Sequence, residues 1–184
     1  MSLINQHIIL KSDSLTVGYT TNTSKTVVAS NINFELNQGE LVGLVGVNGI
    51  GKSTLLRTLT GVQRELFGTI FLKGKHLHAY TNMESAKVMS VVLTEHIATK
   101  NLSVFEIIAL GRHPYTNWFG SLNKTDHTII NTVMSQTNIE DLKHKKSYEL
   151  SDGQLQKVMI TRALAQDTDL IILDEPTTHL DLYH

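Results

Sequence analysis

Gly46-Val47-Asn48-Gly49-Ile50-Gly51-Lys52-Ser53 is the most informative stretch of this 184-residue chain. Its spacing, G-x-x-x-x-G-K-[ST], is that of a phosphate-binding loop. Glycines permit the backbone angles that turn N–H groups inward around phosphate oxygens, and the N-terminus of a following helix adds partial positive charge. An accidental glycine-rich turn would match this pattern in roughly one per cent of chains of this length. We therefore interpret residues 46–53 as a loop that binds a nucleoside triphosphate.

The C-terminal end of the loop carries the residues expected to contact the nucleotide most directly. Lys52 would reach the β- and γ-phosphates, Ser53 would ligate Mg²⁺, and Thr54 would touch the α-phosphate. The other loop residues of the candidate ATP site are Gly46, Asn48, Gly49 and Gly51.

The sequence on either side of the loop fits this interpretation. Residues 41–45 are apolar on both faces, which predicts a buried parallel strand that leads into the loop. Residues 54–59 predict a helix that ends at Gly61. Farther upstream, apolar and polar residues alternate at 15–19 and at 32–36, which predicts two strands, the second followed by a turn at 37–39.

Beyond the loop the pattern changes from strands to helices and back. A strand at 69–72 precedes a turn at 73–75, and 103–148 has helical apolar spacing at Val104, Ile107, Ile108 and Leu110. Another helix is expected to start near Ser151, and the apolar strand 170–173 follows it. This order predicts the α/β class, with a phosphate-loop core and parallel sheet, an antiparallel β subdomain and a helical insertion. We expect one domain over residues 1–184, with a helical subdomain at about 103–165.

Two acidic residues follow the strand at 170–173. A strand that delivers adjacent carboxylates to its C-terminal end places them where α/β folds bind ligands. Asp174 would hold Mg²⁺ through water, and Glu175 would orient the attacking water. An apolar strand followed by Asp-Glu is common in isolation and then marks only a strand end. Together with a phosphate loop, the pair is interpreted as a Walker B element.

Leu150-Ser151-Asp152-Gly153-Gln154 closely resembles the Leu-Ser-Gly-Gly-Gln signature of ABC ATPases, with Asp152 at the first glycine position. Ser151 and Gln154 also have the spacing of a capping box, so an ordinary helix cap is the alternative interpretation. The resemblance implies that Ser151, Gly153 and Gln154 bind the γ-phosphate of a nucleotide held by the opposite subunit of a dimer, at a helix N-terminus that favours anions.

The order of elements resembles the ABC ATPase family across nearly the whole chain. Tyr19 stands where the family has an aromatic residue that stacks on adenine, although a strand aromatic is almost as good an interpretation. Asp181 matches the D-loop, which crosses the dimer interface. Glu95 stands where the family has the glutamine of the Q-loop, so the resemblance assigns it a metal-binding and catalytic position but with an added negative charge.

Residues 110–118, Leu-Gly-Arg-His-Pro-Tyr-Thr-Asn-Trp, resemble the stretch after the Q-loop in ATPases of iron-siderophore, haem and cobalamin importers. In those proteins it borders the groove that receives a helix of the membrane subunit. Tyr115 and Trp118 suit such an interface. An exposed loop with two half-buried aromatic residues is the alternative.

The resemblance also implies partners, cofactors and a location. It implies ATP and Mg²⁺, transmembrane permease subunits, a second ATPase cassette in a homodimer, and a peripheral place on the cytoplasmic face of the inner (plasma) membrane. A net charge of −1 and the lack of a basic run argue against a nucleic-acid partner. Cysteine is absent, which excludes disulfides and thiolate metal sites. Two alternative functions remain. The protein is a soluble ABC ATPase that is not coupled to transport, or it only binds nucleotide.

The family continues past the D-loop into further strands and a switch histidine, whereas this sequence ends at His184, three residues after Asp181. We therefore expect the C-terminal part of the cassette to be absent and this chain alone to hydrolyse ATP weakly. Among the nine histidines, His76 and His78 form the only close pair, and we expect both to be solvated surface residues rather than metal ligands.

Overall fold

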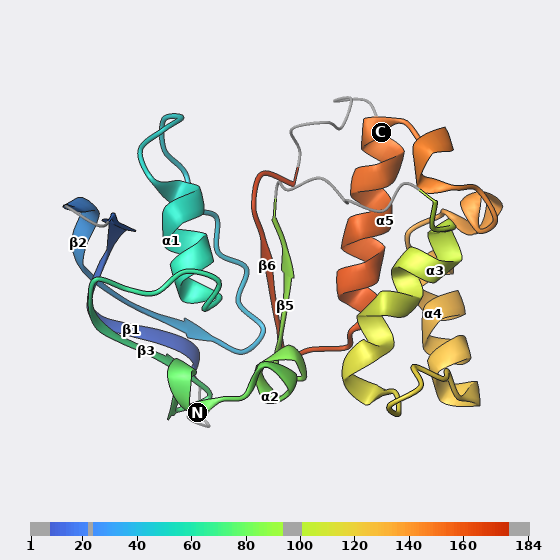
Figure 1. Ribbon diagram of the computed structural model, residues 1–184, viewed down its shortest axis with the longest axis horizontal. Helices are drawn as coiled ribbons and strands as arrows, with labels where there is room; N and C mark the ends of the chain where they lie inside the picture. The colour runs from blue at the N-terminus through green and yellow to red at the C-terminus, as the bar shows by residue number, and fades with distance from the viewer. Residues whose placement is uncertain (1–7, 22–23, 94–100, 177–184) are drawn as a thin grey trace, which may run out of the picture. The chain divides into compact units, whose positions relative to one another are not determined.

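The computed structural model describes residues 8–21, 24–93 and 101–176. It divides into two compact units, residues 1–85 and 86–184 (Figure 1). Each unit has its own sheet and its own buried side chains, and each is described by itself below.

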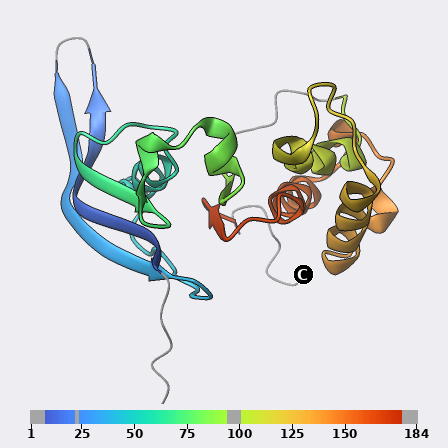
Figure 2. The same ribbon diagram turned by 90° about the horizontal axis from the view of Figure 1, so that it is seen from below.

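An antiparallel sheet forms most of the first unit. Its strands are β1 (Ile8–Thr20), β2 (Lys25–Asn37), β3 (Phe67–Leu72) and β4 (Lys75–His76), in the spatial order β2-β1-β3-β4. Figure 2 shows β1 and β2 running side by side along their length. Leu15 and Val17 alternate with polar neighbours and are fully buried, as the sequence pattern predicts.

The turns of this sheet occur where the sequence predicts them. Gly39 adopts a positive φ of 81° after β2. Lys73 and Gly74 both have positive φ, 48° and 76°, which is the geometry of the tightest hairpins and joins β3 to β4.

The helices of the first unit are short. They are α1 (Lys52–Leu59), the 3₁₀ turn η1 (Leu77–Ala79) and α2 (Asn82–Ala86), which reaches the boundary of the second unit. Helix α1 ends at Leu59 with Thr60 as its C-cap, and Gly61 follows with a positive φ of 76°. The predicted end of this helix at glycine is therefore confirmed.

The prediction of a buried parallel strand at residues 41–45 is wrong. These residues form no strand, and Leu41 is 100% exposed. A parallel strand needs a neighbouring strand to accept its backbone hydrogen bonds, whereas the described strands of the first unit form the antiparallel order β2-β1-β3-β4 without this segment. Apolar composition predicts that a segment favours burial, but it does not supply the strand against which the segment would pair.

The second unit contains a parallel pair of strands and a group of helices. Strands β5 (Met89–Val92) and β6 (Leu170–Leu173) pair in parallel, Met89 opposite Leu170. The helices are α3 (Val104–Ala109), α4 (Lys124–Gln136) and α5 (Asp152–Ala165), with 3₁₀ turns η2 (Leu110–Tyr115), η3 (Glu140–Leu142) and η4 (Ser147–Glu149). Leu110, expected on the buried face of α3, is half exposed because α3 ends at Ala109 and the chain tightens into η2.

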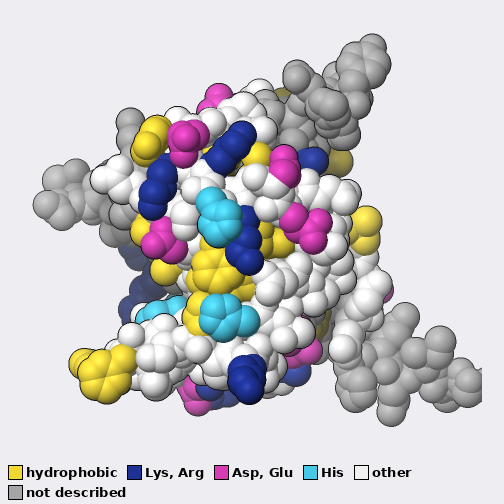
Figure 3. All heavy atoms as spheres, turned by 90° about the vertical axis from the view of Figure 1, so that its right-hand side faces the viewer, with side chains coloured by type: hydrophobic (Ala, Val, Ile, Leu, Met, Phe, Trp, Pro, Cys, Tyr) yellow, Lys and Arg dark blue, Asp and Glu magenta, His cyan; other side chains and the backbone are white. Residues whose placement is uncertain are grey.

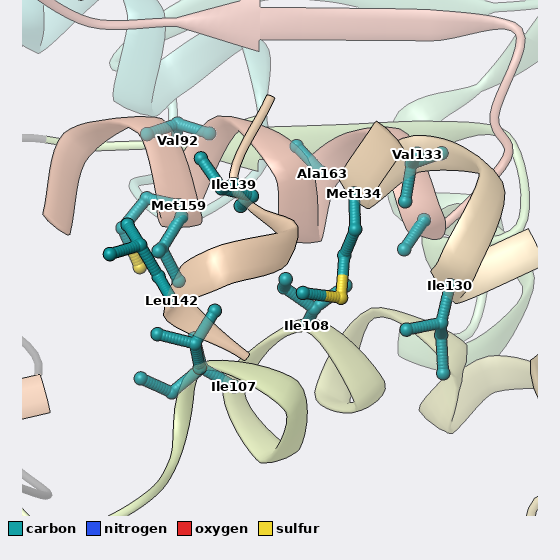
Figure 4. Close-up of a cluster of buried hydrophobic side chains, with 13 residues drawn as sticks. Val92, Ile107, Ile108, Ile130, Val133, Met134, Ile139, Leu142, Met159 and Ala163 are labelled. Carbon is teal, nitrogen blue, oxygen red and sulfur yellow. The ribbon is translucent and has the colours of Figure 1, made fainter. Parts of the chain in front are cut away.

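The core of the second unit is a cluster of apolar side chains from α3, α4, α5 and β5. Ile108 of α3, Met134 of α4 and Val92 of β5 are almost completely buried in it. Figure 4 shows the side chains of the cluster pointing toward one another from the three helices. Fully burying one such side chain stabilises the folded state by about 1.5–3 kcal/mol. The cluster therefore holds α5 and β5 together through their shared buried side chains.

The outer surface of the second unit is mixed in character. Figure 3 views the side on which α3 and α4 lie, where histidine and lysine side chains surround a small apolar patch. The ring of His127 stacks on Phe105 with 5.8 Å between centroids, and Lys143 Nζ lies 5.0 Å from the centre of the Phe105 ring.

The histidine pair of the first unit contacts other side chains. His78 Nε2 lies 2.7 Å from a carboxylate oxygen of Glu65, and the ring of His76 packs against Phe71. Within the described ranges, no three His, Cys, Asp or Glu residues are grouped as a metal site would require.

The mixed α/β fold predicted from the sequence is confirmed, with an antiparallel sheet, a parallel pair and a set of helices between β5 and β6. That residues 1–184 form one ATPase domain with a helical subdomain at about 103–165 stays a prediction. None of the helices in the described residues has both the length and the apolar character needed to cross a membrane.

Candidate nucleotide-binding site

The phosphate loop of the first unit closes around the side chain of Lys52. Lys52 Nζ donates hydrogen bonds to the backbone carbonyls of Gly46 (2.8 Å) and Val47 (3.0 Å). Gly49 and Gly51 supply the left-handed backbone angles of the loop, with φ of 81° and 108°. The ammonium group therefore lies within the curve of the loop, where the negative charge of phosphate oxygens would be stabilised.

Gly51 is also the point at which the loop meets the sheet. A Cβ atom at this position would lie 2.1 Å from Cγ1 of Val28 on β2, so only glycine fits the approach. The carbonyl of Gly51 accepts the first helical hydrogen bond of α1 from the N–H of Leu55, at 2.9 Å. Ser53 and Thr54 are thereby held in the first turn of α1, where the positive end of the helix dipole favours an anion.

Tyr19 lies beside this loop. Tyr19 is the second-last residue of β1, and its hydroxyl oxygen is 2.5 Å from Oγ1 of Thr54 on α1. The structure thus brings together two residues that the sequence predicts for the nucleotide site, although they are 35 positions apart in the chain. That Tyr19 stacks on adenine stays a prediction.

The two carboxylates follow β6 in the second unit, as the sequence predicts. The N–H of Asp174 donates to the carbonyl of Val92 at 2.8 Å, which extends the β5–β6 pairing by one bond. Asp174 is buried, whereas Glu175 is exposed and has a left-handed backbone with φ of 48°. Such strained backbone angles in residues other than glycine gather at functional sites.

Ser53 of the first unit and Asp174 of the second unit each carry an oxygen of a kind that binds Mg²⁺. The cation prefers hydroxyl, carboxylate and phosphate oxygens, and Ser53 and Asp174 offer a hydroxyl and a carboxylate. Ser53 lies in the first turn of α1, and Asp174 directly follows the last residue of β6.

The start of α5 has the capping box predicted from the sequence. The N–H of Gln154 donates to Oγ of Ser151 at 3.3 Å, and the N–H of Ser151 donates to Oε1 of Gln154 at 3.1 Å. Ser151 and Asp152 are exposed, while Val158 and Met159 on the next turns are buried. The helix N-terminus with Gly153 is therefore accessible, and its contact with a γ-phosphate stays a prediction.

Two predicted site residues lie outside the described residues. These are Glu95, at the position of the Q-loop glutamine, and Asp181 of the D-loop. Their roles stay predictions.

Arg112 is a buried residue that the sequence does not single out. Its Nε donates to Oδ1 of Asp126 on α4 at 2.9 Å, and its Nη1 donates to the carbonyl of Ala165 at the end of α5, also at 2.9 Å. The guanidinium carbon lies 4.0 Å from the centre of the Tyr115 ring. Arg112 therefore joins η2 to both α4 and the helix that begins at the signature.

Asp126 is buried beside this arginine. Burial raises the pKa of its carboxyl, but the backbone N–H of Asn123 and the charge and hydrogen bond of Arg112 more than offset that effect, so the pKa lies below its ordinary value. The sequence feature that could have drawn attention to Asp126 is its spacing from Asn123, because the two residues form the capping box of α4.

The segment after η2 presents two adjacent aromatic residues to solvent. Trp118 is 97% exposed and Phe119 is 88% exposed. The side-chain carbonyl of Asn117 accepts hydrogen bonds from the N–H groups of Phe119 and Ser121, both at 3.1 Å. Exposed large apolar side chains on an ordered turn are typical of a surface that binds another molecule. The alternative interpretation, a loop in which Tyr115 and Trp118 are both half-buried, therefore does not hold for Trp118.

Comparison with known proteins identifies relatives over nearly the whole chain. An uncharacterized ABC transporter ATP-binding protein of Methanocaldococcus jannaschii is 44% identical over 96% of this chain. The iron(3+)-hydroxamate import ATP-binding protein FhuC of Bacillus subtilis is 37% identical over 95% of it. Among solved structures, a chain assigned to the metal-chelate type of ABC transporter, in an inward-facing conformation, superposes with a TM-score of 0.77 at 30% identity over 95% of this chain.

The chain spans less than two thirds of the length of these relatives: 59% of the Methanocaldococcus protein, 64% of FhuC and 63% of the solved chain. A sequence profile of the family described as ABC transporter matches residues 29–178, from β2 through the phosphate loop, the signature and both carboxylates. On this match the protein belongs to the ABC transporter family.

Proposed function

We propose that the protein is the ATP-binding and ATP-hydrolysing subunit of an importer, and that it drives uptake of an iron-siderophore, haem or cobalamin through partner membrane subunits. The observation that carries the ATP-binding part is the phosphate loop, with the Lys52 ammonium enclosed by the carbonyls of Gly46 and Val47. On ATP binding, phosphate oxygens would take over from these carbonyls as partners of Lys52.

Each loop residue has a place in this proposal. Lys52 holds the β- and γ-phosphates, Ser53 ligates the metal and Thr54 contacts the α-phosphate. Backbone N–H groups of the loop complete the cradle, and they are contributed by Gly46, Asn48, Gly49 and Gly51. Mg²⁺, when bound through Ser53, Asp174 and Glu95, would offset the charge that develops on the phosphate oxygens.

Glu175 is proposed to orient the water that attacks the γ-phosphate. Its exposed carboxylate follows directly on buried Asp174, so one strand end supplies both a group for the metal and a group for water. Glu95 is proposed to act in catalysis as well, from the position of the Q-loop. Phosphoryl transfer requires mostly positioning and charge stabilisation, which these residues can provide.

The second nucleotide contact is proposed to come from another copy of the chain. Ser151, Gly153 and Gln154 at the accessible start of α5 would bind the γ-phosphate held by the partner, and Asp181 would cross the same interface. In support, α5 begins with a formed capping box and exposed residues at its tip.

Import is supported by the relatives, since FhuC is described as an import protein for iron(3+)-hydroxamate. We propose that Trp118 and Phe119 contact a membrane subunit at the cytoplasmic face of the inner membrane. In support, both side chains are exposed on a turn that Asn117 holds through two hydrogen bonds, so little ordering entropy would be lost on binding.

The import hypothesis is tested by uptake in cells that lack this gene. Such cells should lose accumulation of at least one of three labelled compounds: a ferric hydroxamate, haem or cobalamin. The wild-type gene should restore it. Trp118→Ser/Phe119→Ser should restore less than about a tenth of the rate if these residues are interface anchors, because a central aromatic anchor is worth 2 kcal/mol or more.

Phe67→Ser is the matched control, since Phe67 is an exposed aromatic on β3 in the first unit, and it should restore uptake fully. ATP binding should be equal in all three proteins. If the gene deletion changes the uptake of none of the three compounds, the protein is an ABC ATPase that is not coupled to their transport.

A further inference from the structure

The hydrogen bond between Tyr19 and Thr54 joins an aromatic side chain to the helix of the phosphate loop. The two oxygens are 2.5 Å apart, at the short end of the range for a hydroxyl pair. Tyr19 is 47% exposed, so part of its ring remains open to solvent beside the loop. Thr54 is only 4% exposed.

Thr54 is a rigid partner for this bond. It lies in the first turn of α1, and a β-branched side chain has few rotamers open to it in a helix. Its backbone carbonyl accepts a further hydrogen bond from the hydroxyl of Thr58 at 2.8 Å. The position of the Tyr19 hydroxyl is therefore set by a group that cannot readily move.

The backbone of Tyr19 is held separately from its side chain. Residue 19 pairs with Thr26 across the β1–β2 ladder. The side-chain amide of Gln63, just after α1, donates a hydrogen bond to the carbonyl of Gly18. Because the strand stays in place without the tyrosine hydroxyl, the bond to Thr54 fixes mainly the direction of the ring.

We propose that Thr54 is a positioning residue for base recognition: its hydroxyl holds the Tyr19 ring in the orientation in which it stacks on the nucleotide base. This inference rests on the proposed binding of ATP. A ring that is already fixed loses less conformational entropy when the base binds, so the bond raises affinity without touching the nucleotide base itself.

The same hydroxyl is able to serve the phosphate side of the site. A threonine hydroxyl carries one donor hydrogen and two acceptor lone pairs. Either hydroxyl can be the donor in this bond. In the proposed complex with ATP, Thr54 accepts the hydrogen of the Tyr19 hydroxyl and keeps its own hydrogen for the α-phosphate. Thr54 then links the base end of the site to the phosphate end through a single oxygen.

The test compares ATP with inorganic triphosphate, which has the phosphates but no base, by calorimetric titration in the presence of Mg²⁺. The measured quantity is the ratio of the two dissociation constants. Tyr19→Phe keeps the ring but removes its hydroxyl, and Thr54→Val removes the partner hydroxyl. Each should lower the preference for ATP about three- to ten-fold, the usual net effect of one hydrogen bond.

The combined variant Tyr19→Phe/Thr54→Val should lower the preference no further than Thr54→Val alone, since both changes break one bond. Thr54→Ser restores a hydroxyl and should restore the preference. Thr58→Val is the matched control on the same helix, because its hydroxyl bonds within α1 and not to Tyr19. It should leave the preference unchanged.

An unchanged preference in Tyr19→Phe would overturn the inference while leaving ATP binding intact. A rise in ATP affinity in that variant would overturn it too, since the bond would then be one that ATP has to break. If the wild-type protein binds neither ligand, the proposed function fails and the inference fails with it.

Discussion

Glu175→Gln is expected to reduce ATP turnover by about 10²- to 10⁴-fold, the usual contribution of a positioned general base. Glutamine has the size of glutamate but cannot take a proton from the attacking water. ATP affinity should stay within about two-fold of the wild type, because in the proposed site Lys52, Ser53 and Asp174, and not Glu175, bind the phosphates and the metal. The measurement is steady-state phosphate release with excess ATP and Mg²⁺, alongside equilibrium ATP binding.

Glu140→Gln is the matched control, since Glu140 is an exposed carboxylate on η3 in the same unit. It should leave turnover unchanged. The Glu175→Gln protein should also form more dimer on size exclusion with ATP, because ATP held by two copies is not consumed. Turnover that persists in Glu175→Gln, with no additional dimer, would show that a different group orients the water.

Arg112→Met is expected to lower the free energy of unfolding of the second unit by about 3–5 kcal/mol, which is the usual cost of leaving one partner of a buried ion pair uncompensated. Both side chains of the pair are buried, so solvent provides little screening. The change also removes the hydrogen bond to the carbonyl of Ala165. Urea unfolding followed by helical circular dichroism measures the loss.

The pH dependence of this loss identifies its cause. In the wild type the pKa of Asp126 is lowered, so the stability it contributes is present above the ordinary carboxyl pKa and is lost as the pH falls through the folded value. In Arg112→Met, burial still raises the pKa of Asp126 and only the hydrogen bond from Asn123 and the charge of His127 still lower it, so this pKa is higher than in the wild type and the destabilisation should shrink as the pH falls toward 4.

Arg112→Met/Asp126→Asn should be more stable at neutral pH than Arg112→Met, because no charge remains buried and the amide oxygen can still accept from Asn123. A double variant no more stable than the single one would mean that lost packing, rather than the unpaired carboxylate, causes the destabilisation.

Much of this fold could be predicted from local sequence. The turn at Lys73 and Gly74, the end of α1 before Gly61 and the capping box of Ser151 and Gln154 each depend on residues within a few positions of one another. The phosphate loop could be predicted for the same reason, since its glycines and Lys52 lie within eight consecutive residues, 46–53. Local patterns are visible in sequence because their partners are adjacent.

The features that the sequence did not reveal depend on partners far along the chain. Arg112 gives no sign in sequence of its bonds to Asp126 and Ala165, which lie 14 and 53 positions away. The bond between Tyr19 and Thr54 spans 35 positions. Residues 41–45 were expected in a strand because they are apolar, yet a strand exists only where another backbone pairs with it.

Calorimetric titration of ATP with Mg²⁺ into the wild-type protein and into Lys52→Ala measures whether residues 46–54 bind ATP through the Lys52 ammonium. Lys124→Ala, which removes a lysine at the start of α4, is the control. Lys52→Ala should bind ATP about ten- to a hundred-fold more weakly, since charge-assisted hydrogen bonds to phosphate contribute about 1.5–3 kcal/mol each. Equal dissociation constants for the three proteins would contradict the assignment of this loop to the nucleotide.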